Sequence, residues 1–284
     1  MTLIGLPLWY GTVSKHKSIE EILALAKSKG IEYFEISIDY PWPYRKRDLL
    51  DSIVVNLTNL GFRIAVHAPW RDIHLASTYE DIRRASVKEV IRSIKDYSEK
   101  AEYIVIHAST AQKLTINNIR REILGALKKS IDEILESLGE NTYICIENLS
   151  SGFPSEMQDI VDAVINTTNC LVLDVAHAYV TFIKHYKHHY NDFIEYLDDL
   201  IKMFKGIEIP VVHYHDVHFS NGFREHIIPC DDITKHKELL KRLRTIMPRF
   251  FLIEAFIDKN GRHLDITELI NRCRELMTWI KIYL

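Results

Sequence analysis

Eight short apolar segments alternate with helix-like segments along the whole chain. The apolar segments are rich in Ile, Val, Phe and Tyr, which is typical of buried parallel strands. The expected strands are Leu3–Leu8, Ile31–Ile38, Phe62–His67, Tyr103–His107, Thr142–Glu147, Leu171–Asp174, Pro210–His215 and Phe250–Ala255. Eight strand–helix units in 284 residues predict one α/β domain over residues 1–284, folded as a (β/α)8 TIM barrel.

The segments between these strands space their apolar residues as helices do. Ser18 and Glu21 form a capping-box pattern at the first of them, and Gly30 ends it. The chain has neither a Gly-rich dinucleotide turn nor a P-loop, so a doubly wound open sheet is the less favoured alternative. The expected helices are Ile19–Lys29, Asp48–Leu60, Glu80–Lys100, Ile116–Leu138, Ser155–Ile165, Tyr190–Phe204, Lys235–Ile246 and Asp265–Ile280.

The composition argues against several classes of protein. The net charge of −3 argues against a globally basic nucleic-acid binder, although a local basic groove is compatible with it. No apolar run approaches the length of a membrane span, and residues 3–10 look like a strand rather than a signal peptide. We therefore expect a cytoplasmic protein without a membrane partner. The cysteines are scattered and are expected to be buried thiols: Cys145, Cys170, Cys230 and Cys273.

Six of the apolar segments end in a histidine or a carboxylate. In a TIM barrel the carboxyl ends of the strands meet at one face, where active sites are built. Histidine and carboxylate side chains are ligands for zinc, manganese, cobalt and iron. Any one of these residues alone could be structural, but several crowded together would repel and desolvate one another without a cation. The predicted metal ligands are His67, His107, Glu147, Asp174, His213 and Glu254.

The motifs at these strand ends are more specific than the residue types alone. They are His67-Ala-Pro-Trp followed by Leu75-Ala-Ser, Ile106-His107, Glu147-Asn148, Asp174-x-x-His177, His213-x-x-Asp216, Arg224-Glu-His226-x-x-Pro229 and Glu254. From about the second strand to the eighth, the chain resembles the xylose isomerase-like barrels, which include endonuclease IV and the sugar isomerases and epimerases.

The endonuclease IV resemblance implies three zinc ions. The first would be held by His67, His107 and Glu147, and the second by Glu147, Asp174, His213 and Glu254. The third would be held by His177, His226 and an Asp two residues before His226. That position is Arg224 here, whose positive charge opposes a third metal, although Glu225 beside it offers a carboxylate in a shifted loop.

This departure favours the sugar-enzyme branch of the resemblance. There Glu147, Asp174, His213 and Glu254 would form a single metal core, while His177 and Arg224 would contact the substrate. We expect one to three divalent ions of zinc, manganese or cobalt. The predicted activity is isomerisation or epimerisation of a sugar or sugar phosphate, with Glu147 and Glu254 moving a proton through an enediolate. A keto acid or an inositol derivative also suits this core.

An abasic-site endonuclease, a zinc phosphodiesterase acting on DNA, is the alternative function. Residues 39–47 contain three successive basic residues before a helix, where they suggest a nearby anion. Together with Trp42, Trp70 and Arg71, this loop could contact an opened, abasic DNA strand. A solvated loop over the barrel rim explains the same residues. A non-catalytic metal-binding or ligand-sensing barrel is a third possibility, and His215 is a candidate supporting residue beside the ligands.

Overall fold

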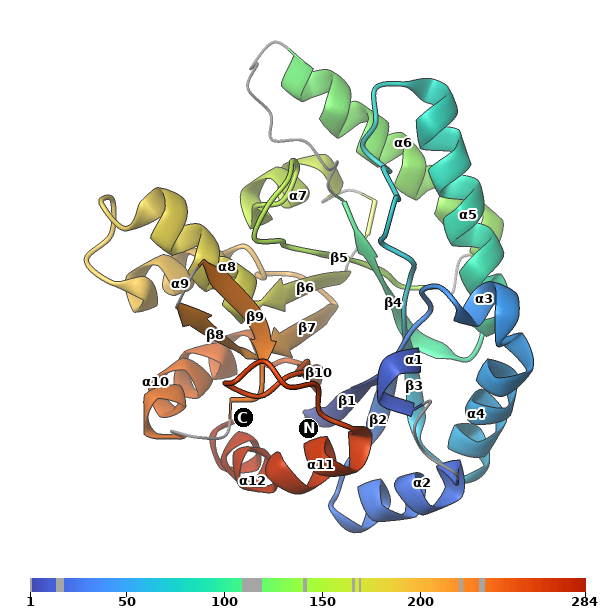
Figure 1. The fold of residues 1–284 in the computed structure, drawn as a ribbon. Coiled ribbons are helices and arrows are strands. Elements are labelled where there is room, and N and C mark those ends of the chain that lie inside the picture. The colour runs from blue at the N-terminus through green and yellow to red at the C-terminus, as the bar shows by residue number, and fades with distance from the viewer. Residues whose placement is uncertain are drawn as a thin grey trace.

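The computed structural model describes residues 2–13, 18–108, 119–139, 142–164, 167–168, 170–219, 222–229 and 233–284. Within these residues, eight parallel strands close into a barrel in the order β1-β2-β3-β4-β5-β6-β7-β10 (Figure 1). This confirms the predicted (β/α)8 fold. The barrel strands are β1 Leu3–Leu8, β2 Tyr33–Ser37, β3 Arg63–His67, β4 Ala101–His107, β5 Ile144–Glu147, β6 Cys170–Asp174, β7 Ile209–Tyr214 and β10 Phe250–Ile253.

Helices surround the barrel (Figure 1). The predicted start of the first is confirmed, because the Ser18 side chain accepts a hydrogen bond from the Glu21 backbone N–H. The helix predicted over Asp265–Ile280 is instead two helices that meet at Cys273. The helices between and after the strands are α2 Ile19–Ser28, α4 Arg47–Asn59, α5 Glu80–Ser98, α6 Arg120–Leu138, α7 Met157–Val164, α9 Phe193–Lys202, α10 Ile233–Leu243, α11 Ile266–Arg272 and α12 Arg274–Tyr283. Of the residues predicted helical, 116–118 and 165 lie outside the described part of the chain.

Several short elements at the strand ends were not predicted. Two of them are single helical turns, α1 Tyr10–Val13 and α3 Trp42–Arg45. After β6 the chain turns at once into α8, Val175–Thr181, because the Asp174 side chain caps this helix by accepting the His177 backbone N–H. After β7 it forms a hairpin of β8, Asp216–Phe219, and β9, Phe223–Ile227. The hairpin packs beside α8 at the rim of the barrel (Figure 1).

Side chains of alternate strand residues fill the barrel interior, because successive residues of a strand point to opposite faces. Each predicted metal ligand lies two residues beyond an interior apolar residue, as His213 does beyond Val211 and Glu254 beyond Leu252. The ligands therefore point inward, in the layer next to the cavity. The interior apolar residues are Tyr33, Ala65, Tyr103, Val105, Cys145, Cys170, Val172, Ile209, Val211, Phe250 and Leu252.

The structure corrects the prediction that all four cysteines are buried thiols. Cys145 and Cys170 form a disulfide inside the barrel, with their Cα atoms 4.5 Å apart. They meet because β5 and β6 are neighbours and their register aligns Ile146 with Leu171. Twenty-five residues separate the two cysteines in sequence, so only the strand pairing brings them together. Cys273 is buried, as predicted, and Cys230 lies outside the described residues.

In the described part of the chain, no helix has both the length and the apolar character needed to cross a bilayer.

Gly5 of β1 leaves room for the Tyr33 ring, since a Cβ atom at Gly5 would lie 2.4 Å from that ring. We predict that Gly5→Ala lowers the free energy of unfolding by about 1–3 kcal/mol through overpacking. Gly125→Ala is the matched control, because nothing lies within 4 Å of its Cβ position. In helix α6 this control should raise the free energy of unfolding by about 0.5–1 kcal/mol. Urea unfolding measures both, and equal effects would contradict the packing argument.

Candidate metal centre

A cavity of about 580 Å³ opens at the carboxyl ends of the strands. Predicted ligands at the ends of four barrel strands line its floor together with His177 and His226, and aromatic side chains form its walls. The floor residues are His67, His107, Glu147, His177, His226 and Glu254, and the aromatic wall residues are Trp9, Tyr10, Tyr40, Trp70 and Phe256.

The central group consists of Glu147, Asp174, His213 and Glu254, whose candidate ligand atoms all lie within 4.8 Å of one another. His213 Nδ1 is 3.3 Å from Glu147 Oε1 and 3.1 Å from Glu254 Oε2. All four side chains are buried. His213 Nδ1 and Glu254 Oε2 have no hydrogen-bond partner despite their burial. A divalent cation would satisfy these atoms and offset the repulsion among three carboxylates, so the donor set fits a metal ion.

A second group shares Glu147 with the first. His67 Nε2 lies 3.4 Å and His107 Nε2 lies 3.1 Å from Glu147 Oε2. His67 Nδ1 donates to the Ala68 carbonyl at 2.9 Å, which directs its Nε2 toward Glu147. Glu147 thus presents Oε1 to the central group and Oε2 to this pair, the arrangement of a carboxylate that bridges two cations.

The electrostatics of the metal-free site follow from this crowding. Burial raises the pKa of Glu147, but His213, His107 and His67 outweigh it and hold that pKa well below its usual range. Burial lowers the pKa of His67, but the hydrogen bond and charge of Glu147 outweigh it and raise the pKa to about 9. Burial and the nearby His215 lower the pKa of His226 to about 4. His226 is therefore neutral at pH 7, whereas His67 carries a proton that a metal ion would displace.

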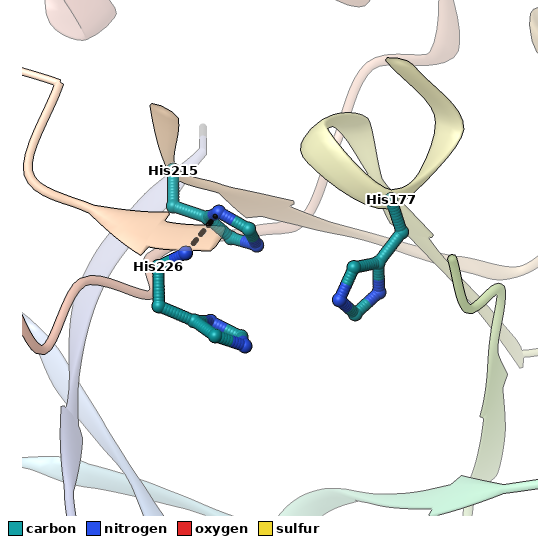
Figure 2. A group of neighbouring side chains, drawn as sticks. All are labelled: His177, His215 and His226. Carbon is teal, nitrogen blue, oxygen red and sulfur yellow. Dashed lines mark hydrogen bonds between the residues drawn. The ribbon is translucent and has the colours of Figure 1, made fainter. Parts of the chain in front are cut away.

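The third group brings together His177, His215 and His226 (Figure 2). His177 Nδ1 donates to the Asn148 carbonyl at 3.0 Å, and His226 Nδ1 donates to the Glu254 carbonyl at 3.3 Å. The Nε2 atoms of both rings therefore stay available as ligands. His177 and His226 lie where the sequence analysis placed a third metal or a substrate contact.

His215 has a different role in this group, because both its ring nitrogens are occupied. Its Nδ1 accepts the His226 backbone N–H at 2.8 Å, the dashed line in Figure 2, which is closer than the Asp216 carbonyl at 3.2 Å. Its Nε2 then carries the proton and donates to Asp174 Oδ2 at 3.0 Å. His215 therefore holds the Asp174 carboxylate in place, the supporting position that the sequence suggested.

The structure corrects the expectation that Arg224 contacts the substrate. Arg224 is exposed and its guanidinium lies over Gly261, outside the cavity lining. Glu225 turns inward instead, with Oε1 3.8 Å from His177 Nε2 and Oε2 accepting from Ser150 Oγ at 3.0 Å. His226 has a φ of 57°, so the regular alternation of the strand breaks there and both Glu225 and His226 face the third group.

The predicted aromatic contacts separate into two classes. Trp70 is 43% exposed and lies beside His107, and the Arg71 guanidinium lies over its ring at 5.2 Å. Arg71 also pairs with Asp39 at 3.1 Å. Trp42 is 0% exposed, which corrects the expectation that it contacts DNA. Its helical turn places the ring beneath the rim, in contact with Tyr10.

Sequence reasoning missed Glu35, Trp9 and Phe256. Glu35 lies in the interior of β2, buried against His213, and Trp9 and Phe256 form part of the cavity wall. The apolar segment Ile31–Ile38 contains two carboxylates, Glu32 and Glu35, and Glu35 lies two residues beyond the interior residue Tyr33, a signal that could have identified it.

The structure is a TIM barrel whose strand ends carry buried clusters of His, Asp and Glu that are consistent with divalent metal binding. The chain belongs to the xylose isomerase-like TIM barrel family, which matches residues 23–281.

Known proteins resemble this chain in amino-acid sequence or in three-dimensional structure. An uncharacterized protein of Methanocaldococcus jannaschii is 25% identical over 222 residues, which are 78% of this chain and 81% of the relative. The structure of a D-tagatose 3-epimerase-like protein superimposes with a TM-score of 0.72 at 20% identity, covering 99% of this chain and 98% of that one. Endonuclease IV from Thermus thermophilus superimposes with a TM-score of 0.63 at 17% identity, covering 99% of both chains. These structural likenesses establish the shared fold.

Metal binding should release protons at neutral pH. In the metal-free protein His67 is protonated at pH 7, since its pKa is about 9, and ligation requires an unprotonated Nε2. We therefore predict that the affinity for Zn²⁺ rises between pH 7 and pH 9. Calorimetric titration at pH 7 in two buffers of different ionisation enthalpy counts the protons released. An affinity that is flat over this range would contradict the assigned protonation of the site.

Proposed function

We propose that the chain is a divalent-metal-dependent sugar epimerase or isomerase that moves a proton at the carbon beside a carbonyl group. The observation that carries the proposal is the pair of buried carboxylates, Glu147 and Glu254, which both reach the cavity. In the barrel order β6 and β7 separate β5 from β10, so the two carboxylates approach from different sides. Epimerisation needs this arrangement, because one base takes the proton from one face and a second acid returns it to the other.

The surrounding residues prepare both carboxylates for proton transfer. Burial raises the pKa of Glu254, but the positive charge of His213 outweighs it and lowers that pKa, as the surrounding histidines do for Glu147. Both carboxylates are therefore ionised at neutral pH, and either can accept the proton. The divalent cation, when bound by the central group, supplies the positive charge that stabilises the enediolate of the substrate. His107 and His177 line the same cavity and can form hydrogen bonds with sugar hydroxyl groups.

The cavity lining favours an unphosphorylated sugar over a sugar phosphate. Among the described lining residues there is no lysine, and the arginine among them, Arg71, is paired with Asp39. Arg224 lies over Gly261 and is not among the described lining residues, so it is not placed to bind a phosphate group in the cavity. The aromatic walls suit the apolar C–H faces of a sugar. A structural relative of this fold, D-psicose 3-epimerase from Clostridium cellulolyticum H10, was solved with D-tagatose.

An abasic-site endonuclease is the second candidate, and two observations favour it. Trp70 is exposed at the rim under Arg71, where it could stack on a base of an opened strand. Glu225 also supplies a carboxylate beside His177, where the resemblance to endonuclease IV places an Asp.

Cleavage of an abasic duplex, with binding that weakens steeply as the salt concentration rises, would identify this function. A Trp70→Ala variant should then lose DNA binding and keep its metal content.

Replacing either carboxylate should abolish sugar turnover without unfolding the barrel. We predict that Glu147→Gln and Glu254→Gln each lower the rate by about 10²–10⁴-fold, the usual contribution of a general acid or base. The assay screens ketoses, with their phosphates as comparison, for exchange of a C–H proton with solvent deuterium. Circular dichroism checks the fold, and metal analysis checks how much of the loss follows from lost metal.

Glu102→Gln is the matched control for these variants. Glu102 is also a barrel-strand glutamate, but it pairs with Arg63 and Arg249 near the start of β4, at the opposite end of the barrel. This variant should turn over substrate as the parent does. Near-parental activity in either the Glu147 or the Glu254 variant would rule out the two-carboxylate mechanism.

A further inference from the structure

Glu35 occupies a position in the barrel that apolar residues usually fill. It points inward from β2 and is 2% exposed, immediately below the central group of ligands. Its Oε2 lies 3.1 Å from His213 Nε2 and accepts the Tyr103 hydroxyl at 2.8 Å. Burying a carboxylate costs free energy unless hydrogen-bond partners replace the lost water. A buried Glu35 therefore indicates a role other than filling space in the core.

The position of Glu35 determines which nitrogen of His213 can bind a cation. The imidazole ring lies between two sets of carboxylates, with Nδ1 facing Glu147 and Glu254 and Nε2 facing Glu35. A ring nitrogen can act as a ligand only when it carries no proton. A hydrogen bond from Nε2–H to Glu35 keeps the proton on the far nitrogen and leaves the Nδ1 lone pair directed at the metal core.

Tyr103 of β4 in turn holds Glu35. The Tyr103 hydroxyl lies 2.8 Å from Glu35 Oε2 and 3.3 Å from the Tyr33 hydroxyl. All of these side chains are fully or almost fully buried, so water does not compete for the same hydrogen bonds. The chain from Tyr103 through Glu35 to His213 therefore crosses the barrel from β4 to β2 to β7 and fixes the orientation of the ring.

We infer that Glu35 is a positioning residue, which holds His213 in the orientation and tautomer that the metal core requires. Partners of this kind raise the basicity of a ligating histidine and restrict its rotation, and their loss typically weakens metal binding by about 10–100-fold. The inference rests on the metal site of the proposed function and not on its sugar chemistry, so it holds equally for an epimerase and for a nuclease.

Metal affinity tests the inference without any substrate. The protein is stripped with a chelator and titrated with Zn²⁺ and with Mn²⁺ against a competing chromophoric chelator. Glu35→Leu, which removes the acceptor, should weaken binding by about 10–100-fold with the number of ions unchanged. Glu35→Gln retains a weaker acceptor and should lose less affinity. Tyr103→Phe, which frees Glu35 without touching His213, should lose less than Glu35→Leu.

Ser130→Ala separates positioning from a general loss of stability. The Ser130 hydroxyl is buried and donates to the Leu75 carbonyl, but it lies outside all the candidate ligand groups. This variant should unfold more easily and bind metal as the parent does. A second readout is the His213 Nε2–H proton in the nitrogen-15 NMR spectrum of the zinc form. It should exchange slowly with solvent in the parent and faster in Glu35→Gln.

The outcomes distinguish the inference from the proposed function. Metal affinity equal to that of the parent in both Glu35→Leu and Glu35→Gln would overturn the inference. If Glu35→Leu does not fold, the exchange rate of the His213 Nε2–H proton in Glu35→Gln decides instead, and a rate equal to that of the parent would overturn the inference. Loss of one whole ion in Glu35→Gln would also overturn it, because Glu35 would then be a ligand alongside His67 and Glu254, whose candidate ligand atoms lie within 4.8 Å of its own. A parent chain that binds neither ion would refute the metal-dependent function itself.

Discussion

The rest of the site depends on burying the Glu147 carboxylate among histidines. A carboxylate that is 1% exposed is unfavourable unless its partners compensate for lost water, and here each oxygen faces a different set of histidines. The barrel makes this possible because parallel strands deliver inward side chains from several directions to one layer. Glu147 joins the central group to the second group, so the geometry of one limits the geometry of the other.

The fold could be predicted from sequence because it follows from simple periodicities, and the strand ends indicated the candidate ligands, whereas the central group among them was implied by the family resemblance. Eight apolar segments gave the barrel, and the two-residue step along a strand placed His213 and Glu254 on the inner face. The rest depends on events that no periodicity reveals. The left-handed φ at His226 turns Glu225 inward and leaves Arg224 outside. A helical turn buries Trp42, and strand pairing alone joins Cys145 to Cys170.

Family membership constrains the fold, whereas the chemistry of the cavity constrains the substrate. The family shares its barrel among enzymes with different substrates, so the fold does not select one of them. The walls of the cavity are more informative, since its arginine is neutralised by Asp39 and its rim is aromatic. An anionic substrate would meet the carboxylates of the floor with little compensating charge, whereas a neutral polyol would meet donors, acceptors and apolar ring faces.

The His215 ring links the β8–β9 hairpin to the candidate metal ligand Asp174. One of its nitrogens accepts from the backbone of the β8–β9 hairpin at His226, and the other donates to Asp174. A ligand that displaced His226 would break the first bond and remove a constraint on the second. The binding of such a ligand and the binding of a cation at Asp174 would then be coupled, and by thermodynamic reciprocity each would change the affinity for the other by the same factor.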